Sequence, residues 1–133
     1  MNPFEKLVLE KKHWKWGWGR YGLSRNPSIT PEFVEKYENK PWYWSSNGLS
    51  RNPSITPDFV EKHENKPWEW GHFGISSNPS ITPEFVEKHI NNHWDWGNWG
   101  LSSNPFTSYI YREKIKLIKQ WFPLHISHYI VKN

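Results

Sequence analysis

The sequence predicts an all-α protein, a short α-solenoid of 26-residue two-helix repeats with N- and C-terminal capping helices. Three observations lead to this prediction. A 26-residue unit recurs in register, each copy opens on a W-x-W pair, and each of the first three copies carries a strongly helical P-[ED]-F-V-E-K word. A fixed period of this length is typical of solenoids, in which each unit buries its apolar face only against its neighbours.

We interpret residues 1–133 as a single repeat domain. The predicted parts are an N-terminal half repeat at 1–15, full repeats at 16–41, 42–67 and 68–93, and a degenerate fourth repeat with C-terminal cap helices at 94–133. Hydrophobic content is only 35%, but the aromatic content of 18% includes eleven Trp. Because each Trp buries a large area, a few side chains per unit suffice to hold neighbouring units together.

The half of each unit that follows Asn-Pro is predicted to be a short helix with a defined start. In the second unit, the Thr56 hydroxyl can cap the helix, and Pro57 suits the first helical position because its missing N–H is not needed there. Phe59, Val60 and His63 share one face, and charged residues occupy the other. The helix should therefore bury one face and expose the other.

The segment that opens each unit is predicted to be a second short helix, buried on both sides between adjacent units. On a helical projection Trp42 and Leu49 lie on one side, and Trp44 and Asn47 on the other. The place of Asn47 is taken by Tyr21, Phe73 or Trp99 in the other copies. Gly48 and its counterparts allow close backbone approach but weaken a helix by about 1 kcal/mol each. A partly 3₁₀ or loop segment therefore stays open, and the alternation of W-x-W keeps a mixed β/α repeat as the alternative.

Both ends are predicted to be caps. Leu7 and Val8 fall in phase with Phe33 and Val34, so the N-terminus imitates the helical half of a unit. Near the C-terminus an amphipathic helix is expected, which ends at Pro123 and is followed by a last short helix or strand. One stripe of this helix holds Tyr111, Ile115, Ile118 and Phe122, and its other side holds Arg112, Lys116, Lys119 and Gln120. Polar-faced ends are what a solenoid needs to stay in solution.

The charge is distributed unevenly along the chain. Residues 1–25 carry +4, residues 26–104 carry −4 and residues 105–133 carry +4. A nucleic-acid groove normally runs a basic stripe along the repeats, so this distribution makes nucleic acid an unlikely partner. The chain has no Cys, no secretory leader and no membrane-spanning run, from which we expect an intracellular protein that is not secreted.

The repeated words W-x-W, G-L-S-x-N-P-S-I-T and P-E-F-V-E-K-H, over residues 14–105, resemble the tandem repeats abundant in hypothetical proteins of giant DNA viruses that infect amoebae. The resemblance implies a viral protein expressed inside a host cell, in its cytoplasm or in the viral factory. It brings no catalytic residues with it. From Tyr109 onward the chain departs from the repeat pattern, so nothing transfers there.

Motifs for catalysis or cofactor binding are absent from the sequence. No phosphate loop, HExxH or GxSxG occurs, so we expect a non-enzyme without cofactor or metal. His125-x-x-His128 has metal-like spacing but lacks a nearby third ligand. His63 and His89 share a repeat position with Tyr37, which favours packing over metal binding. The paired Trp could stack sugars or bases, but a role in the core is the simpler interpretation.

We expect a binding surface to lie at positions where the residue changes from copy to copy while the rest of the repeat stays the same. These positions predict binding by Tyr43, Glu69 and Asp95, by Arg20 and His72, and by Arg25 and Arg51. A second candidate is a basic patch of Arg112, Lys114, Lys116 and Lys119.

The favoured function is a scaffold, monomeric or weakly self-associating, that mediates protein–protein interaction, with a host protein as the expected partner. The alternatives are a binder of nucleic acid or anionic surfaces through the basic termini, and a Trp-lined carbohydrate-binding repeat.

Overall fold

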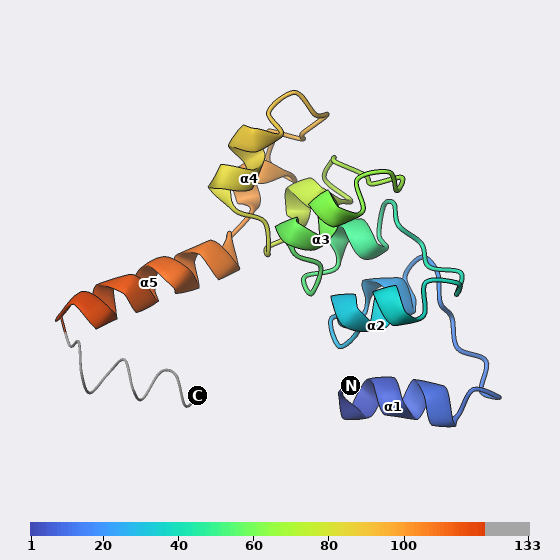
Figure 1. Ribbon diagram of the computed structural model, residues 1–133. Coiled ribbons are helices and arrows are strands. Elements are labelled where there is room, and N and C mark those ends of the chain that lie inside the picture. The colour runs from blue at the N-terminus through green and yellow to red at the C-terminus, as the bar shows by residue number, and fades with distance from the viewer. Residues whose placement is uncertain (122–133) are drawn as a thin grey trace.

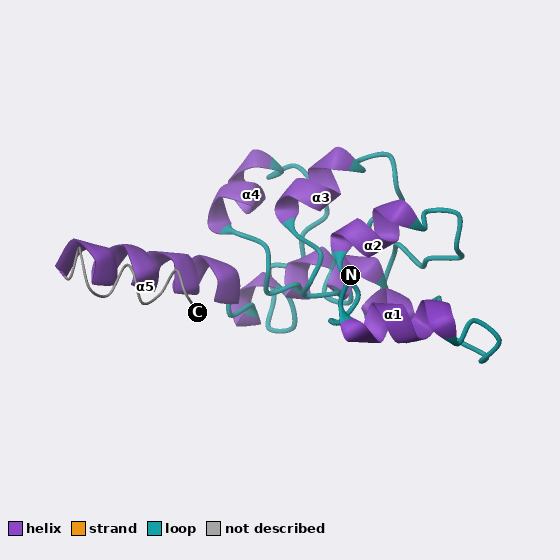
Figure 2. Ribbon diagram, turned by 60° about the horizontal axis from the view of Figure 1, so that its bottom comes forward, coloured by secondary structure: helices purple, strands orange, loops and turns teal. Residues whose placement is uncertain are grey.

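The computed structural model describes residues 1–121, and within this range the chain consists of helices and loops without a strand (Figures 1 and 2). The α-helices are α1 (Pro3–Glu10), α2 (Pro31–Lys36), α3 (Pro57–Lys62), α4 (Pro83–Lys88) and α5 (Thr107–Trp121). Short 3₁₀ helices are η1 (Leu23–Arg25), η2 (Leu49–Arg51), η3 (Ile75–Ser77) and η4 (Leu101–Ser103). The predicted all-α class is confirmed for this part of the chain.

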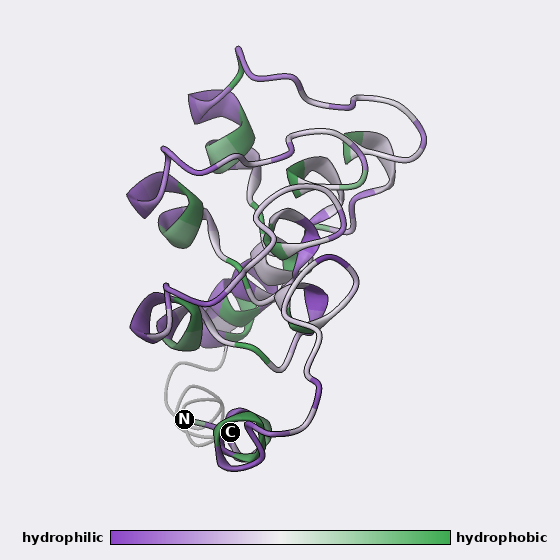
Figure 3. Ribbon diagram, turned by 90° about the vertical axis from the view of Figure 1, so that its right-hand side faces the viewer, coloured by the Kyte–Doolittle hydropathy of each residue, from purple (hydrophilic) through white to green (hydrophobic). Residues whose placement is uncertain are grey.

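The elements recur with the period of the sequence and form two rows. Helices α1 to α4 follow one another side by side in chain order (Figure 1), and each 3₁₀ helix contacts the next, from η1 to η4. Figure 3 shows the hydrophobic faces of the short α-helices turned inward and their hydrophilic faces turned outward. The core therefore lies between the row of α-helices and the row of 3₁₀ helices.

The predicted helix starts are confirmed. The hydroxyl oxygens of Thr30, Thr56 and Thr82 accept hydrogen bonds, at 3.2–3.3 Å, from the main-chain N–H three residues later. A Pro follows each Thr at the first helical position, as the sequence indicated. The Phe and Val of each helix are buried, so one turn and a half of helix suffices to place both in the core.

The W-x-W segment is not the continuous helix that was predicted but the partly 3₁₀ loop that the sequence left open. Trp42–Trp44 have no regular secondary structure, and the chain then turns into η2, where only Leu49–Arg51 are helical. The N–H of Leu49 donates to the main-chain oxygen of Tyr43 at 2.8 Å, and the N–H of Ser50 donates to that of Trp44 at 3.1 Å. These bonds reach back six residues and close a loop, whereas an α-helix reaches back four.

The Trp pairs hold successive units together, as predicted. The second Trp of one unit meets the first Trp of the next in an edge-to-face contact, with ring centroids 5.1–5.4 Å apart. The three pairs are Trp18–Trp42, Trp44–Trp68 and Trp70–Trp94. Such pairs contribute about 0.5–1.5 kcal/mol beyond the area that they bury.

A row of asparagine side chains runs through the stack beside the Trp pairs. Asn52 and Asn78 are completely buried. Nδ2 of Asn52 donates to the main-chain oxygens of Ser24 and Asn26 at 3.0 and 2.9 Å, and its Oδ1 accepts from the N–H of Ser54 at 2.9 Å. Each such Asn thus fixes its own turn and also binds the unit before it.

The two ends of the stack differ. Helix α1 covers the first unit as predicted, because Val8 is buried like its counterpart Val34. Helix α5 leads away from the stack (Figure 1), and none of its side chains is buried. Its ion pair with the stack joins Arg112 to Glu84 at 2.9 Å. Within the described residues α5 therefore does not act as the predicted cap, because its apolar side chains find no core to enter.

Candidate functional site

The residues that vary between copies gather along one edge of the stack, between the middle residue of each W-x-W and the last residue of the 3₁₀ helix that follows it. We call this set the variable edge: Arg20, Tyr21, Arg25, Tyr43, Asn47, Arg51, Glu69, His72, Phe73, Asp95 and Trp99. Contacts that cross each boundary between units connect its members, so the edge is continuous along the repeats.

At the boundary of the first two units, the contacts are polar and aromatic. Nδ2 of Asn47 donates to the hydroxyl of Tyr21 at 3.2 Å, and the Arg51 guanidinium donates to Oδ1 of Asn47 at 3.0 Å. The guanidinium of Arg20 lies 5.2 Å from the Tyr21 ring centroid and 6.0 Å from that of Tyr43. These distances are within the range of cation–π attraction.

The same edge continues across the next two boundaries. The Arg51 guanidinium lies 5.9 Å from the Phe73 ring centroid, which joins the second unit to the third. Nδ1 of His72 lies 3.2 Å from Oδ2 of Asp95, which joins the third unit to the fourth. The sequence-predicted residues Arg20, Arg51, His72 and Asp95 are therefore brought into one row.

A close backbone approach gives these loops their shape. A Cβ on Gly48 would lie 2.1 Å from the main-chain oxygen of Tyr43, and one on Gly74 would lie 2.0 Å from that of Glu69. The residues before Gly22 and Gly48 have a left-handed backbone, with φ of 63° at Tyr21 and 55° at Asn47. Asn adopts this region readily, but Tyr does so at a cost.

Three exposed aromatic residues of the edge were not predicted from the sequence. Tyr21, Phe73 and Trp99 were expected to be buried between units, yet they are 64%, 46% and 79% exposed. The error follows from the helical projection, which is invalid for a segment that is not a continuous helix. The signal that could have found them is the change from Tyr to Asn, Phe and Trp at one position before an unchanged Gly.

The charge of the edge changes sign along the stack. Its first half carries Arg20, Arg25 and Arg51, and burial together with the charge of Arg25 lowers the pKa of Arg51 below its ordinary value. Its second half carries Glu69 and Asp95. One oxygen of each of these carboxylates accepts the N–H of the Gly two residues later at 2.9 Å, so they also shape their own loops.

The basic patch predicted on α5 forms no common site with the variable edge. Arg112 pairs with Glu84, and Nζ of Lys116 lies 3.3 Å from a Glu113 oxygen. Lys114 and Lys119 are exposed on the same helix. No helix within residues 1–121 is both long enough and apolar enough to cross a membrane.

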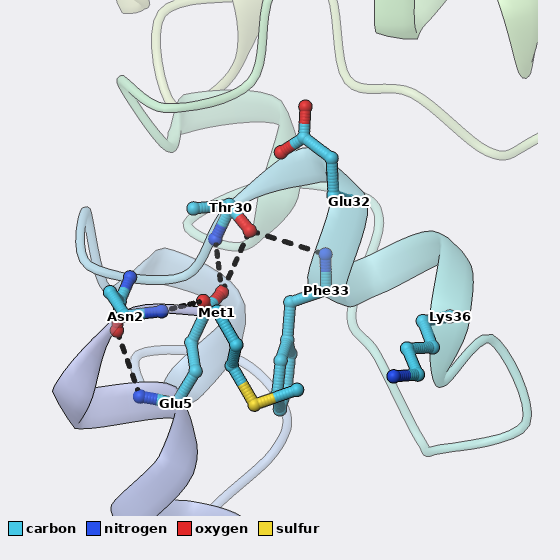
Figure 4. Close-up of a pocket in the computed structure, with 7 residues that line it drawn as sticks. All are labelled: Met1, Asn2, Glu5, Thr30, Glu32, Phe33 and Lys36. Atoms are coloured by element: carbon cyan, nitrogen blue, oxygen red, sulfur yellow. Dashed lines mark hydrogen bonds between the residues drawn. The ribbon is translucent and has the colours of Figure 1, made fainter.

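A cavity of about 370 Å³ lies where α1 meets α2 (Figure 4). The buried Glu5 is one of its lining residues, and the Glu5 carboxylate accepts hydrogen bonds from the N–H and the hydroxyl of Thr30, both at 2.8 Å. It also accepts the N–H of Asn2 at 3.1 Å, within a capping box. Because its carboxylate is fully engaged in joining the two helices, we assign this cavity a structural role.

The histidines behave as packing residues with a polar tip. The His63 ring lies 4.5 Å from that of Phe59, and its Nε2 lies 3.1 Å from a Glu35 oxygen. His89 repeats this arrangement with Phe85 and Glu61. Among residues 1–121, no three His, Asp or Glu side chains are grouped so that they could hold a metal ion. His125 and His128 lie outside the described residues.

Comparisons with models of known protein families, with curated proteins and with solved structures found no match.

Proposed function

We propose that this chain is a non-enzymatic interaction scaffold, a short α-solenoid whose variable edge binds a protein partner. The observation that carries the proposal is the exposed Tyr21, which is 64% exposed and has a φ of 63°. A non-Gly residue in a sparsely populated backbone region costs about 1–3 kcal/mol and is found most often at functional sites. An exposed Tyr ring gains little for the core, so the core does not offset this cost.

The chemistry of the edge supports a protein partner. Tyr, Trp and Arg supply most of the binding energy at protein–protein interfaces, and the edge presents Tyr21 and Trp99 together with three Arg. The change from basic to acidic along the edge also suits a folded partner of complementary charge better than a polyanion.

A capture experiment with matched variants tests the proposal. The full-length chain serves as bait in extract of a host cell, beside an edge variant with Tyr21→Ala, Phe73→Ala and Trp99→Ala. A control variant carries Trp14→Ala and Tyr111→Ala, two exposed aromatic residues outside the edge. We expect a specific partner to be retained by the wild type and the control and lost by the edge variant. Equal capture by all three proteins would refute the assignment of the edge.

The resemblance to giant-virus repeats supports a setting inside a host cell. The carbohydrate alternative required exposed W-x-W pairs, but Trp42, Trp68 and Trp94 are buried. These three rings are therefore not accessible for stacking on a sugar.

A second candidate function belongs to α5, a helix with basic and apolar faces and no buried side chain. Ile110, Leu117 and Trp121 are exposed on it together with Lys116 and Lys119. Basic amphipathic helices of this kind bind anionic membrane surfaces. Cosedimentation with vesicles rich in anionic lipid should exceed that with neutral vesicles and should weaken in Lys116→Gln/Lys119→Gln. Binding to single-stranded nucleic acid but not to vesicles would assign α5 to the nucleic-acid alternative instead.

A further inference from the structure

Helix α1 and the loop after it have the structure of the helical half of a repeat. Trp16 Nε1 donates to the main-chain oxygen of Lys11 at 3.1 Å, as Trp42 Nε1 donates to that of Tyr37 at 2.9 Å. The N–H of Lys11 donates to the oxygen of Leu7 at 2.9 Å, and that of Tyr37 to Phe33 at 3.0 Å. The segment 5–16 therefore repeats the structure of 31–42, and residues 1–4 contain no W-x-W pair.

The fourth unit is the complementary half. Its loop is complete: the N–H of Leu101 donates to the main-chain oxygen of Asp95 at 2.7 Å, and Nδ2 of Asn104 donates to that of Asn78 at 3.0 Å. At Phe106 the backbone becomes left-handed, with φ 45°, and the chain leaves as α5. The position where earlier units place a helix on this loop is not filled by α5.

The end of the fourth unit consequently presents an apolar socket of about 350 Å³. It is lined by Pro83, Val86, Trp96, Leu101, Ser102 and Phe106, and by no residue of α5. Trp44 and Trp70, at the same place in earlier units, stack on Phe59 and Phe85 with centroids 6.1 and 5.9 Å apart. Trp96 has no such partner within residues 1–121 and is 56% exposed.

Hydrogen-bonding groups are complementary at the two ends as well. At internal boundaries Nδ2 of each Asn donates to main-chain oxygens of the preceding unit. We call the end of the stack at α1 and the first unit the head, and the end at the fourth unit the tail. At the head, Nδ2 of Asn26 makes no hydrogen bond to any described residue. At the tail, the main-chain oxygens of Ser102 and Asn104 accept no hydrogen bond from an Asn side chain of the described residues, so the tail offers the acceptors that Asn26 lacks.

We propose that the tail of one copy binds the head of a second copy, so that the loop half of the fourth unit and α1 of the second copy together complete one repeat. The repeat register places Leu7 of the second copy where Phe59 and Phe85 lie in complete units, against Trp96. It places Trp16 of the second copy where Trp68 and Trp94 meet the preceding Trp. The joint between two copies thus has the same geometry as the boundaries between units within one copy, and this is why a second copy is the molecule expected in the socket.

Such a joint uses different surfaces on the two copies. Head-to-tail contacts of this kind form open chains, unless the rotation from one copy to the next brings the last copy back to the first and makes a ring. Each added copy offers a new tail, and the average mass should rise continuously with concentration. This proposal concerns the ends of the stack and is independent of the variable edge.

Two substitutions block the two ends separately. Trp96→Ala removes the largest ring that lines the socket and leaves the other end of the stack intact. Asn26→Asp removes the donor of the head and keeps the oxygen that accepts the N–H of Ser28 at 2.8 Å. Trp99→Ala is the control, because Trp99 is exposed in the same unit but lies outside the socket.

Sedimentation velocity of the full-length chain, over a wide concentration range, tests the joint. The wild type and Trp99→Ala should form species larger than dimers, and each blocking variant should weaken association by more than about tenfold. An equimolar mixture of the two blocking variants should form a dimer and nothing larger, because one intact tail and one intact head remain. A monomeric wild type, a plateau at the dimer, or a monomeric mixture of variants that stay folded by circular dichroism would overturn the proposal.

Discussion

Nδ2 of Asn78 donates a 2.9 Å hydrogen bond to the main-chain oxygen of Asn52, which holds the same place in the preceding unit. Nδ2 of Asn52 donates likewise to the oxygen of Asn26, and that of Asn104 to the oxygen of Asn78. The same Asn therefore shapes its own turn through Oδ1 and binds the preceding unit through Nδ2, and both roles depend on one side-chain carboxamide.

Replacing this carboxamide should be costly only inside the stack. Asn78→Ala removes the donor of the buried main-chain oxygen of Ser50, and an unsatisfied buried group of this kind costs about 1–3 kcal/mol. The main-chain oxygen of Asn52 also loses the Asn78 amide but still accepts the N–H of Ile55 at 3.0 Å. We expect the free energy of unfolding in urea to fall by about 1–3 kcal/mol. Asn26→Ala, measured at low protein concentration, is the matched control because Nδ2 of Asn26 has no described acceptor. Equal losses in both variants would show that the link contributes nothing.

The glycine before each 3₁₀ helix should tolerate no side chain. A Cβ at Gly74 would lie 2.0 Å from the main-chain oxygen of Glu69, so Gly74→Ala must displace backbone. We expect a loss of about 1–3 kcal/mol or more, as for other overpacked sites. A Cβ at Gly19 would meet nothing within 4 Å, and Gly19→Ala should change stability little. Thermal unfolding of both variants provides the comparison.

Stability should decrease in acid through the carboxylates that join successive helices. Hydrogen bonds from His63 and then Lys62 hold the pKa of Glu35 below its ordinary value of 4.5, and Lys88 and then His89 do the same for Glu61. Because the pKa is lower in the folded state, the stabilisation is complete above the unfolded value and is lost as the pH falls through the folded one.

Glu61→Gln tests this contribution. The variant should unfold at a lower temperature than the wild type near neutral pH, and the difference should shrink as the pH falls below 4.5 and through the folded-state pKa of Glu61. Both pairs are partly exposed, so the effect should be small and should shrink in high salt. The control variant is Glu64→Gln, because the exposed Glu64 forms no ion pair with a described residue, and it should unfold at the wild-type temperature near neutral pH. A difference that grows in acid would contradict the assignment.

Removal of a whole unit should preserve the fold. Deleting Trp42–Pro67 joins Pro41 to Trp68, and the contacts that repeat at every boundary, the Trp pairs and the asparagine links, can form again one unit along. Deleting only half a unit should unfold the chain. Two loop halves or two helical halves would then follow one another, and the alternation on which the packing depends would be broken. Circular dichroism and urea unfolding of the two deletions distinguish these outcomes.

The helical half of each unit could be predicted from the sequence because its determinants are local. Thr56 and Pro57 define the start, and Phe59 with Val60 defines the buried face. The W-x-W half could not be predicted correctly, because its form depends on hydrogen bonds that reach back six residues and on the contact of Gly48 with Tyr43.

The candidate site was predicted in part for the same reason. Variation between copies identified Arg20, Arg51 and His72, since a surface position can change without loss of packing. It missed Tyr21, because an incorrect helix placed that ring in the core. The link from Asn78 to Asn52 could not be predicted either. The Asn-Pro motif indicates that Asn78 lies in a turn, but it does not indicate which main-chain oxygen of a neighbouring unit accepts a hydrogen bond from its side-chain amide.

The link between asparagines has a consequence for the shape of longer arrays. It draws the 3₁₀ helices of successive units closer together than the α-helices, which bulky side chains keep apart. Each unit is therefore a wedge with its thin side at the row of asparagines. Wedges stacked in one sense trace an arc, so adding units, or joining copies end to end, bends the assembly around the 3₁₀ side rather than extending it as a straight rod.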